Sequence, residues 1–411
     1  MRVLTLLHEF LLLSLLHTGS SRRKTHKGGS DGPRRGRAHA TTRSGMAVDP
    51  RSGWPAADAN LAAAAAAMGL LEPRRCDFPS IDGTGLSAQN FAREYLRKAP
   101  VVLRGLMDSW PAHQGGWTRE ALLAQHGDAP VTHAQASDVA QFGPKEGGSK
   151  SYVSKLRDWV AATMDSTDDS HAPLAFDRSG GNVAYRLFQQ VSVCHTDPFA
   201  LIPLYETDLS SCHCVQGDFT PPAVLAPGAM DQMLISLGPP RAGLPLHTHG
   251  DSWLALTHGS KLWLVFPPQW GASSAAAAYK LLALRPAAAI IAENLLASLA
   301  DDEQPLVCVQ QPGEIVYLPA LWWHATVNLD GAVGVGAQND VVDYTPATDA
   351  GLEALVAGNP QSGRALYQAA AHFLNSGHDA AGLERGWLLF ESALAAEPLN
   401  FNYWAALARA G

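Results

Sequence analysis

The feature that most constrains the fold is a change of hydrophobic period near residue 233. From there to residue 337, apolar residues recur with a period of two, which is typical of β-strands. Turns rich in glycine and proline separate the apolar runs, which cover residues 233–237, 244–256, 262–266, 306–310, 315–318 and 332–337. Short strands with such turns indicate a β-sandwich or a small barrel. We therefore predict a mainly β domain with added helices.

Helical periodicity lies on both sides of this β region. It covers residues 61–71, 90–98, 118–123 and 152–163, with a short strand at 100–103. An alanine-rich stretch at 269–304 predicts a helical insertion between strands, and helical periodicity returns at residues 363–411.

The C-terminal tail partly matches a tetratricopeptide-like repeat. Phe390, Ala393 and Pro398 have the spacing of the second helix and exit of such a repeat, and Trp404 with Leu407 fits the start of the next one. One and a half repeats cannot bury their own core. Both a helical cap on the barrel and a peptide-binding arm therefore remain open.

The charge of the chain is unevenly distributed. Residues 22–51 hold nine basic and two acidic residues, whereas the residues after 51 hold 20 basic and 35 acidic ones, a net charge of −15. Binding to phosphate needs a positive surface, so we expect no nucleic acid as partner of the main domain. Apolar residues form 46% of the chain, which allows a sizeable core.

The N-terminal sequence indicates a targeting signal followed by a linker. Arg2 precedes a mostly apolar stretch and the small residues Thr18, Gly19 and Ser20, so residues 1–20 are typical of a signal peptide. Residues 21–60 are a basic low-complexity linker or a transit segment. The predicted main domain then covers residues 61–346, and the helical tail covers residues 360–411. No later window is long and apolar enough to predict a membrane span.

The cysteines allow at most two disulfides. Cys76, Cys194, Cys212, Cys214 and Cys308 are odd in number and too sparse for a disulfide scaffold. The Cys212-His213-Cys214 sequence could be half of a zinc site, but no second cluster with ligand spacing follows it. We expect one of these cysteines to join Cys194 in an oxidising compartment, and the pairing itself stays open.

Three histidines form a candidate metal site. His247 and His249 lie two apart on a predicted strand, so their side chains leave the same face about 6.6 Å apart at the backbone. His324 lies at the far end of the strand that follows the turn at 312–313. Three nitrogens from two strands can form a facial triad that leaves other positions open, as non-haem iron requires. The alternative is that these are ordinary histidines among the 16 of the chain.

The surrounding sequence resembles the JmjC, or cupin-like, family of iron and 2-oxoglutarate oxygenases. The similarity rests on the order and spacing of the histidine pair, the block 259–268 and the block 312–324, and on upstream segments at 100–105, 108–111 and 117–118. It spans about residues 90–343. The resemblance implies a double-stranded β-helix, or jelly roll, with Fe(II) bound by the histidines and 2-oxoglutarate as cosubstrate.

The resemblance also assigns two cosubstrate residues. Lys261 is expected to meet the distal carboxylate of 2-oxoglutarate, because a cation in a water-excluded barrel binds a carboxylate strongly; its alternative role is a lysine on the solvated rim. Asn339, fifteen residues past His324, falls where some members of the family place an amide near the cosubstrate. A plain position at the end of a strand is the alternative for Asn339.

One residue departs from the family pattern. The usual first pair is His-x-Asp or His-x-Glu, but the second member here is His249. A neutral imidazole leaves the site with one more positive charge and changes the affinity and the potential of the metal. Asp251 is an alternative ligand, but on a straight strand it lies about 13 Å beyond His247. Only a chain reversal at Gly250 would bring Asp251 close to the metal, or let it hydrogen-bond to an imidazole ligand and orient that ring.

Three functions follow as hypotheses. The first is an Fe(II)- and 2-oxoglutarate-dependent dioxygenase that hydroxylates a protein side chain. The second is a catalytically inactive barrel that acts as a binding or scaffold protein of the secretory pathway, with the helical tail as its interaction arm. The third, a three-histidine cupin dioxygenase without 2-oxoglutarate, leaves Lys261 without a role.

The signal-like start and the similarity to a family member of the endoplasmic reticulum lumen predict that compartment. A plastid, reached through a bipartite presequence, and secretion are the alternatives. We expect a protein as substrate or binding partner. The substrate and the oligomeric state are not specified by the sequence.

Overall fold

A computed structural model describes residues 47–72, 75–135, 152–165, 189–193, 217–228, 232–268, 270, 282, 285, 287–339, 348–375 and 379–397. All belong to the unit that spans residues 43–411. The predicted signal peptide and most of the predicted linker lie outside the described residues, as do Cys194, Cys212 and Cys214. Within the described ranges, no helix combines the length and the apolar character needed to cross a bilayer.

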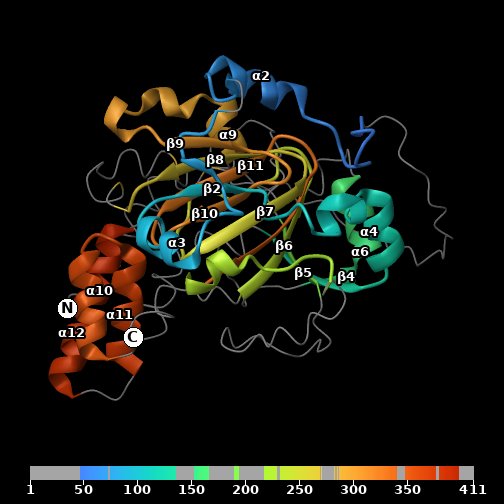
Figure 1. Ribbon diagram of the computed structural model, residues 1–411. Helices are drawn as coiled ribbons and strands as arrows, with labels where there is room; N and C mark the ends of the chain where they lie inside the picture. Colours follow the sequence, from blue (N-terminus) through green and yellow to red (C-terminus); the bar gives the residue numbers. More distant parts are fainter. Residues whose placement is uncertain are drawn as a thin grey trace, which may run out of the picture. The chain divides into compact units, whose positions relative to one another are not determined.

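Two β-sheets form the centre of the fold (Figure 1). The larger sheet has the order β1-β2-β10-β7-β12-β6-β5-β3-β4 and the smaller sheet the order β11-β8-β9. The strands are β1 (Ser80–Asp82), β2 (Val101–Arg104), β3 (Pro130–Gln135), β4 (Tyr152–Lys155), β5 (Gln189–Val193), β6 (Gln232–Gly238), β7 (Ser252–His258), β8 (Lys261–Phe266), β9 (Leu306–Gln310), β10 (Ile315–Leu318), β11 (Trp323–Asn328) and β12 (Ala332–Gln338). This largely antiparallel pair of sheets confirms the predicted jelly-roll class.

Each sheet buries both of its faces. Between the sheets, Leu254 and Val316 of the larger sheet pack with Trp263 and Val265 of the smaller one. Helices α2 (Ala59–Ala67) and α9 (Ala287–Ala292) cover the outer face of the smaller sheet (Figure 1). Helices α3 (Ala88–Glu94), α4 (Arg119–His126) and α6 (Leu156–Trp159) pack against the larger sheet. Helices on both outer faces keep water away from the interior, where the candidate site lies.

The helix starts follow ordinary capping chemistry. The side chains of Asp58, Ser87 and Thr118 accept hydrogen bonds from the first turns of α2, α3 and α4. Helices α2 and α3 begin two residues before the predicted stretches 61–71 and 90–98 and end within them. Helix α4 begins within the predicted stretch 118–123 and ends three residues beyond it. Their existence is therefore confirmed, with shifted ends.

The helix predicted at residues 152–163 is only half correct. Tyr152–Lys155 forms β4, which pairs antiparallel with β3, and α6 begins only at Leu156. Backbone pairing with β3 makes these four residues a strand. The prediction failed here because periodicity alone cannot tell whether a short apolar run is a strand or a helix.

The strand predicted at residues 244–256 is also wrong as a single element. Residues 243–249 run beside β11 of the smaller sheet, where Thr326 N donates to Leu244 O and His324 N to His247 O. β7 begins at Ser252 and belongs to the larger sheet. The chain therefore changes sheets at Gly250, and the run of apolar residues spans this change.

Gly250 has no room for a side chain. A Cβ atom there would lie 2.2 Å from Asn339 O and 2.3 Å from Asn339 Oδ1. The Gly250 amide donates to Asn339 O, and the Asn339 amide donates to Asp251 O. This close approach of two backbones requires glycine at the point where the chain changes sheets.

The fold extends further towards the N-terminus than the predicted boundary at residue 61. Trp54 is fully buried, and its indole nitrogen donates to Trp117 O. Val48 and Pro55 form a β-bridge, and Asp49 accepts from the Ser52 hydroxyl. Residues 47–60 therefore pack as part of the domain.

The C-terminal helices form their own apolar cluster. Helices α10 (Asp349–Gly358), α11 (Gly363–Asn375) and α12 (Ala380–Ala396) bury Leu352, Phe373 and Phe390 between them. Ala365 of α11 also packs against Leu321 of the β-domain. The tetratricopeptide-like relationship stays a prediction, since Trp404 and Leu407 lie outside the described residues.

A disulfide joins Cys76 to Cys308 on β9 across 232 positions of sequence. Next to it, Asp77 N donates to Val307 O and Val309 N donates to Arg75 O. The segment before β1 is thereby fastened to the edge of the smaller sheet. The expected pairing of Cys194 with Cys212 or Cys214 lies outside the described residues.

We expect the double substitution Cys76→Ala with Cys308→Ala to lower the free energy of unfolding by about 2–5 kcal/mol, because the disulfide closes a long loop in the unfolded chain. Chemical denaturation of the non-reduced proteins measures this. An unchanged midpoint, or free thiols at both positions in the native protein by mass spectrometry, would contradict the assignment.

Candidate metal centre

Two segments of the smaller sheet carry the three histidines. His247 and His249 lie on the segment beside β11, and His324 is the second residue of β11. His247 N donates to His324 O over 3.0 Å, and His324 N donates to His247 O over 2.9 Å. Directly opposed residues place their side chains on one face, so this backbone pair brings the imidazoles together.

The three imidazoles converge on one point. Their ring centroids are 4.1 Å apart for His247 and His324, 4.7 Å for His249 and His324, and 5.4 Å for His247 and His249. One nitrogen of each ring lies within 4.8 Å of the others, the spacing of ligands around one metal ion. Among the described residues, only these three form such a group.

Hydrogen bonds fix how each ring faces the others. The Nδ1 atoms lie 2.8 Å from Pro245 O for His247, 2.9 Å from Gly250 O for His249 and 2.9 Å from Trp322 O for His324. A carbonyl can only accept, so each Nδ1 carries the proton and each Nε2 presents a lone pair. Metal-binding histidines are commonly oriented in this way, and the donor set suits a divalent transition metal.

Burial holds the imidazoles of His247 and His324 neutral. Burial lowers the pKa of His247 to about 4. The hydrogen bond to Pro245 O raises this pKa, and the positive charge of Arg364 lowers it further. Burial, with the neighbouring His247 and His249, holds the pKa of His324 well below its usual range. Neutral rings are the form that binds a metal, so no proton has to leave at neutral pH.

Lys261 is fully buried at the start of β8. Its Nζ donates to Asn328 Oδ1 over 2.6 Å, and burial lowers its pKa to about 7. In the β8–β11 ladder, Lys261 lies opposite Asn328, and His324 lies opposite Val265. Asn328 is thus four residues beyond His324 on the same inward face, about 13 Å away at the backbone.

Asn339 lies beside the sheet change. Its backbone pairs with Gly250 and Asp251, and its side chain is buried against Gly250. It is therefore placed next to the segment that carries His249, whereas the residue bonded to Lys261 is Asn328. A role of Asn339 in binding a cosubstrate stays a prediction.

Asp251 does not join the metal-binding group. Its carboxylate accepts hydrogen bonds from Tyr317 Oη over 2.6 Å, from Ala320 N over 3.2 Å and from Arg97 Nε over 3.3 Å. Burial raises its pKa, and these donors oppose the rise. The chain changes sheets at Gly250, and the Asp251 carboxylate faces this network of donors.

Two parts of this arrangement could not be predicted from the sequence. Asn328 lies four residues after His324, but nothing in the local sequence indicates that it meets Lys261. The donors to Asp251 come from residues 66 and more positions away. Such long-range partners leave no local signal in one sequence.

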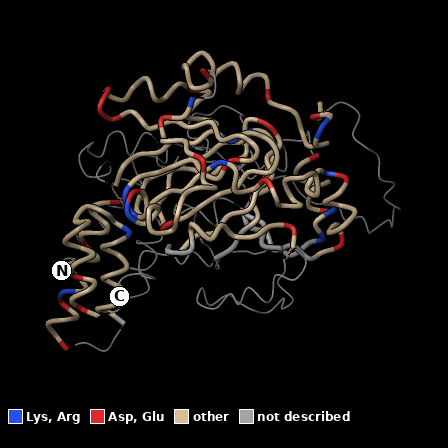
Figure 2. The backbone as a smooth tube through the Cα atoms, in the orientation of Figure 1, with Lys and Arg blue, Asp and Glu red and all other residues tan. Residues whose placement is uncertain are grey.

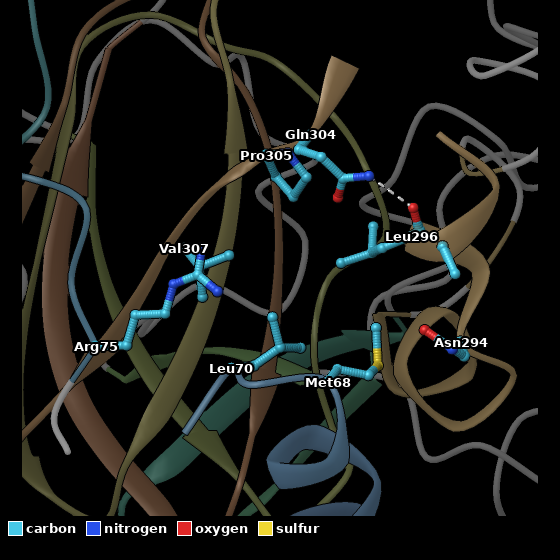
Figure 3. Close-up of a pocket in the computed structure, with 9 residues that line it drawn as sticks. Met68, Leu70, Arg75, Asn294, Leu296, Gln304, Pro305 and Val307 are labelled. Carbon is cyan, nitrogen blue, oxygen red and sulfur yellow. Dashed lines mark hydrogen bonds between the residues drawn. The ribbon is translucent and has the colours of Figure 1, made fainter. Parts of the chain in front are cut away.

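A separate cavity of about 260 Å³ lies on the outside of the smaller sheet. Its walls include Met68, Leu70 and Leu296, and Gln304 donates to Leu296 O at its rim (Figure 3). The Arg75 guanidinium that lines it is already paired with Asp77. It contains none of the three histidines and is not part of the candidate metal centre.

Figure 2 shows lysine and arginine interspersed with aspartate and glutamate along the backbone of the described residues.

Comparison with known proteins agrees with this geometry. Lysine-specific demethylase JMJ21 of Arabidopsis thaliana is 28% identical over 261 residues, which cover 61% of this chain and 24% of that protein. JmjC domain-containing protein 8 of Mus musculus is 24% identical over 283 residues, which cover 68% of this chain and 87% of that protein. Bifunctional arginine demethylase and lysyl-hydroxylase psr-1 of Caenorhabditis elegans is 24% identical over 276 residues, 64% of this chain and 62% of that protein.

The chain thus spans about a quarter of the plant demethylase and most of the mouse protein. The sequence also matches the family described as "Cupin-like domain" over residues 87–337, more than half of the chain. This range includes β2, both histidine segments and all of β12 except its last residue. The chain therefore belongs to the cupin-like domain family, among relatives that carry JmjC domains.

Proposed function

We propose that this protein is an Fe(II)- and 2-oxoglutarate-dependent oxygenase that hydroxylates a protein side chain. The observation that carries the proposal is the convergence of His247, His249 and His324, each with its Nδ1 atom held by a carbonyl. When bound, iron and 2-oxoglutarate supply the oxidation chemistry of this class. The protein binds and orients both and excludes water.

Lys261 would bind the distal carboxylate of 2-oxoglutarate. It is buried on the same inward face as His324. The backbones of the two residues are about 13 Å apart along the strand, a distance that a lysine side chain and the five-carbon chain of 2-oxoglutarate can span together. Burial disfavours the charged form of Lys261 and lowers its pKa to about 7, and a bound carboxylate would stabilise that charged form. Asn328 Oδ1 accepts from the Lys261 ammonium and so directs it.

The relatives support the reaction class and a protein substrate. The name of psr-1 states arginine demethylation and lysyl hydroxylation, and a Danio rerio relative, 29% identical over 109 residues, is named 2-oxoglutarate and iron-dependent oxygenase JMJD4. Reactions of this kind act on protein side chains. We extend the hydroxylase reaction, but no particular substrate, to this chain.

A catalytically inactive barrel is the second candidate. The observation that favours it is the neutral third ligand, since His249 replaces the usual carboxylate and Asp251 is held elsewhere. A three-histidine cupin without 2-oxoglutarate is less consistent with the structure, because it gives the buried Lys261 no function.

We further propose that the protein works in the secretory pathway, in the endoplasmic reticulum lumen. Disulfides persist in oxidising compartments and are rare in the cytosol. The disulfide between Cys76 and Cys308 supports this location together with the signal-like residues 1–20.

The metal site can be tested by anaerobic titration with Fe(II) and 2-oxoglutarate. We expect a metal-to-ligand charge-transfer band in the native protein and none in His324→Ala. We expect Lys261→Met to weaken 2-oxoglutarate binding by about 10- to 100-fold, because a buried charge-assisted contact is lost. His372→Ala and Lys155→Met, which remove a tail histidine and an exposed lysine, serve as controls. A folded native protein without the band would favour the inactive barrel.

The lowered pKa of Lys261 predicts a pH dependence of cosubstrate binding. Its pKa is about 7 without ligand, and a bound carboxylate raises it. Above about pH 7, binding takes up a proton, so the Kd for 2-oxoglutarate should increase with pH by up to about tenfold per pH unit and stay nearly constant below.

Calorimetry on the Mn(II)-loaded protein, between about pH 6 and pH 8.5, measures this dependence. Above about pH 7, the heat of 2-oxoglutarate binding should depend on the ionisation enthalpy of the buffer, because binding takes up a proton. In Lys261→Met, this heat should no longer depend on the buffer. A Kd that does not change with pH would show that Lys261 stays charged or does not contact the ligand.

A further inference from the structure

Asp251 is a fully buried acid that the proposed reaction does not use. It lies two residues after His249, with no exposed surface, yet its carboxylate faces away from the triad. Tyr317 Oη and Ala320 N both donate to its Oδ1, and Arg97 Nε donates to its Oδ2. The donors come from β10, from the loop between β10 and β11, and from the segment after α3.

The loop at residues 319–322 connects this network to the metal centre. Ala320 N donates to the Asp251 carboxylate, and the next amide, Leu321 N, donates to His249 O over 2.9 Å. The following residue, Trp322, accepts through its carbonyl from Nδ1 of His324. The position of this short loop therefore sets where the ring of His324 points relative to His249.

The loop does not hold this shape by itself. Leu321 has a φ of +66°, in the left-handed region that costs a residue with a branched side chain of order 1 kcal/mol or more. Such a conformation persists only when contacts around it hold it. The two adjacent amide bonds, to Asp251 and to His249, are contacts of that kind.

A second strained residue closes the network from the other side. Arg97 has a φ of +58°, and its amide donates to Tyr317 Oη over 2.9 Å. The Tyr317 hydroxyl thus accepts from Arg97 and donates to Asp251. The Arg97 guanidinium faces the carboxylate, and the acid accepts hydrogen bonds at both oxygens.

We propose that Asp251 is a positioning residue for the metal centre: through Ala320 it holds the loop 319–322, and through this loop it fixes the distance and orientation between His249 and His324. The inference rests on the metal site proposed above. It explains why an acid two residues from a metal ligand is buried without binding the metal.

Asp218 provides a matched control. It is another buried carboxylate of the same domain, and it accepts hydrogen bonds from Trp117 Nε1 and from His126 Nε2, both at 2.9 Å. These partners belong to the layer outside the larger sheet. Loss of Asp218 should disturb folding in a similar way without moving the histidines.

The test compares Asp251→Asn and Asp218→Asn as full-length chains. Co(II) affinity and the visible d–d spectrum report the geometry of the histidines, and the thermal midpoint of the metal-free protein reports stability. We expect both variants to lower the midpoint. Only Asp251→Asn should weaken Co(II) binding, by about 10- to 100-fold, and shift the d–d bands, as is typical when a residue that supports metal ligands is lost.

Tyr317→Phe keeps the Asp251 carboxylate and removes one of its donors, so it should weaken Co(II) binding in the same direction but by less. This variant takes the place of Asp251→Asn in the test if Asp251→Asn does not fold. Native affinity and an unshifted spectrum in a folded Asp251→Asn protein would overturn the inference, as would equal losses of affinity in both aspartate variants. A native protein that binds no Co(II) would instead refute the metal site itself, before any variant is compared.

Discussion

The backbone pair between His247 and His324 is the contact on which the proposed function depends. Two hydrogen bonds, of 3.0 Å and 2.9 Å, place one residue of the segment 243–249 directly opposite one residue of β11. His249 then follows on the same face, because side chains alternate along an extended chain. A shift of this pairing by one residue would turn both histidines of the pair away from His324.

The water-excluded interior determines the chemistry of the charged residues. It keeps His247 and His324 neutral and lowers the pKa of Lys261 to about 7. A site with three neutral ligands and a nearby lysine attracts dianionic 2-oxoglutarate more strongly than a site that already contains a carboxylate. The replacement of the usual acid by His249 is therefore compatible with cosubstrate binding, while it changes the affinity for the metal.

Much of the β-domain could be predicted from the sequence, because the strands β6, β8, β9, β10 and β12 carry a clear period-two pattern with turns between them. The convergence of the histidines followed from their spacing and from the family resemblance. The change of sheets at Gly250 could not be predicted, since apolar residues continue on both sides of it. The partners of Asp251 and Lys261 lie 66 to 154 positions away and are visible only in three dimensions.

X-ray absorption spectroscopy of the Co(II)-loaded protein tests most directly whether the three histidines bind one ion. We expect multiple scattering from three imidazole rings in the native protein and from two rings in His249→Ala. A spectrum that fits fewer than three imidazoles, or that does not change when His249 is replaced, would contradict the proposed metal centre.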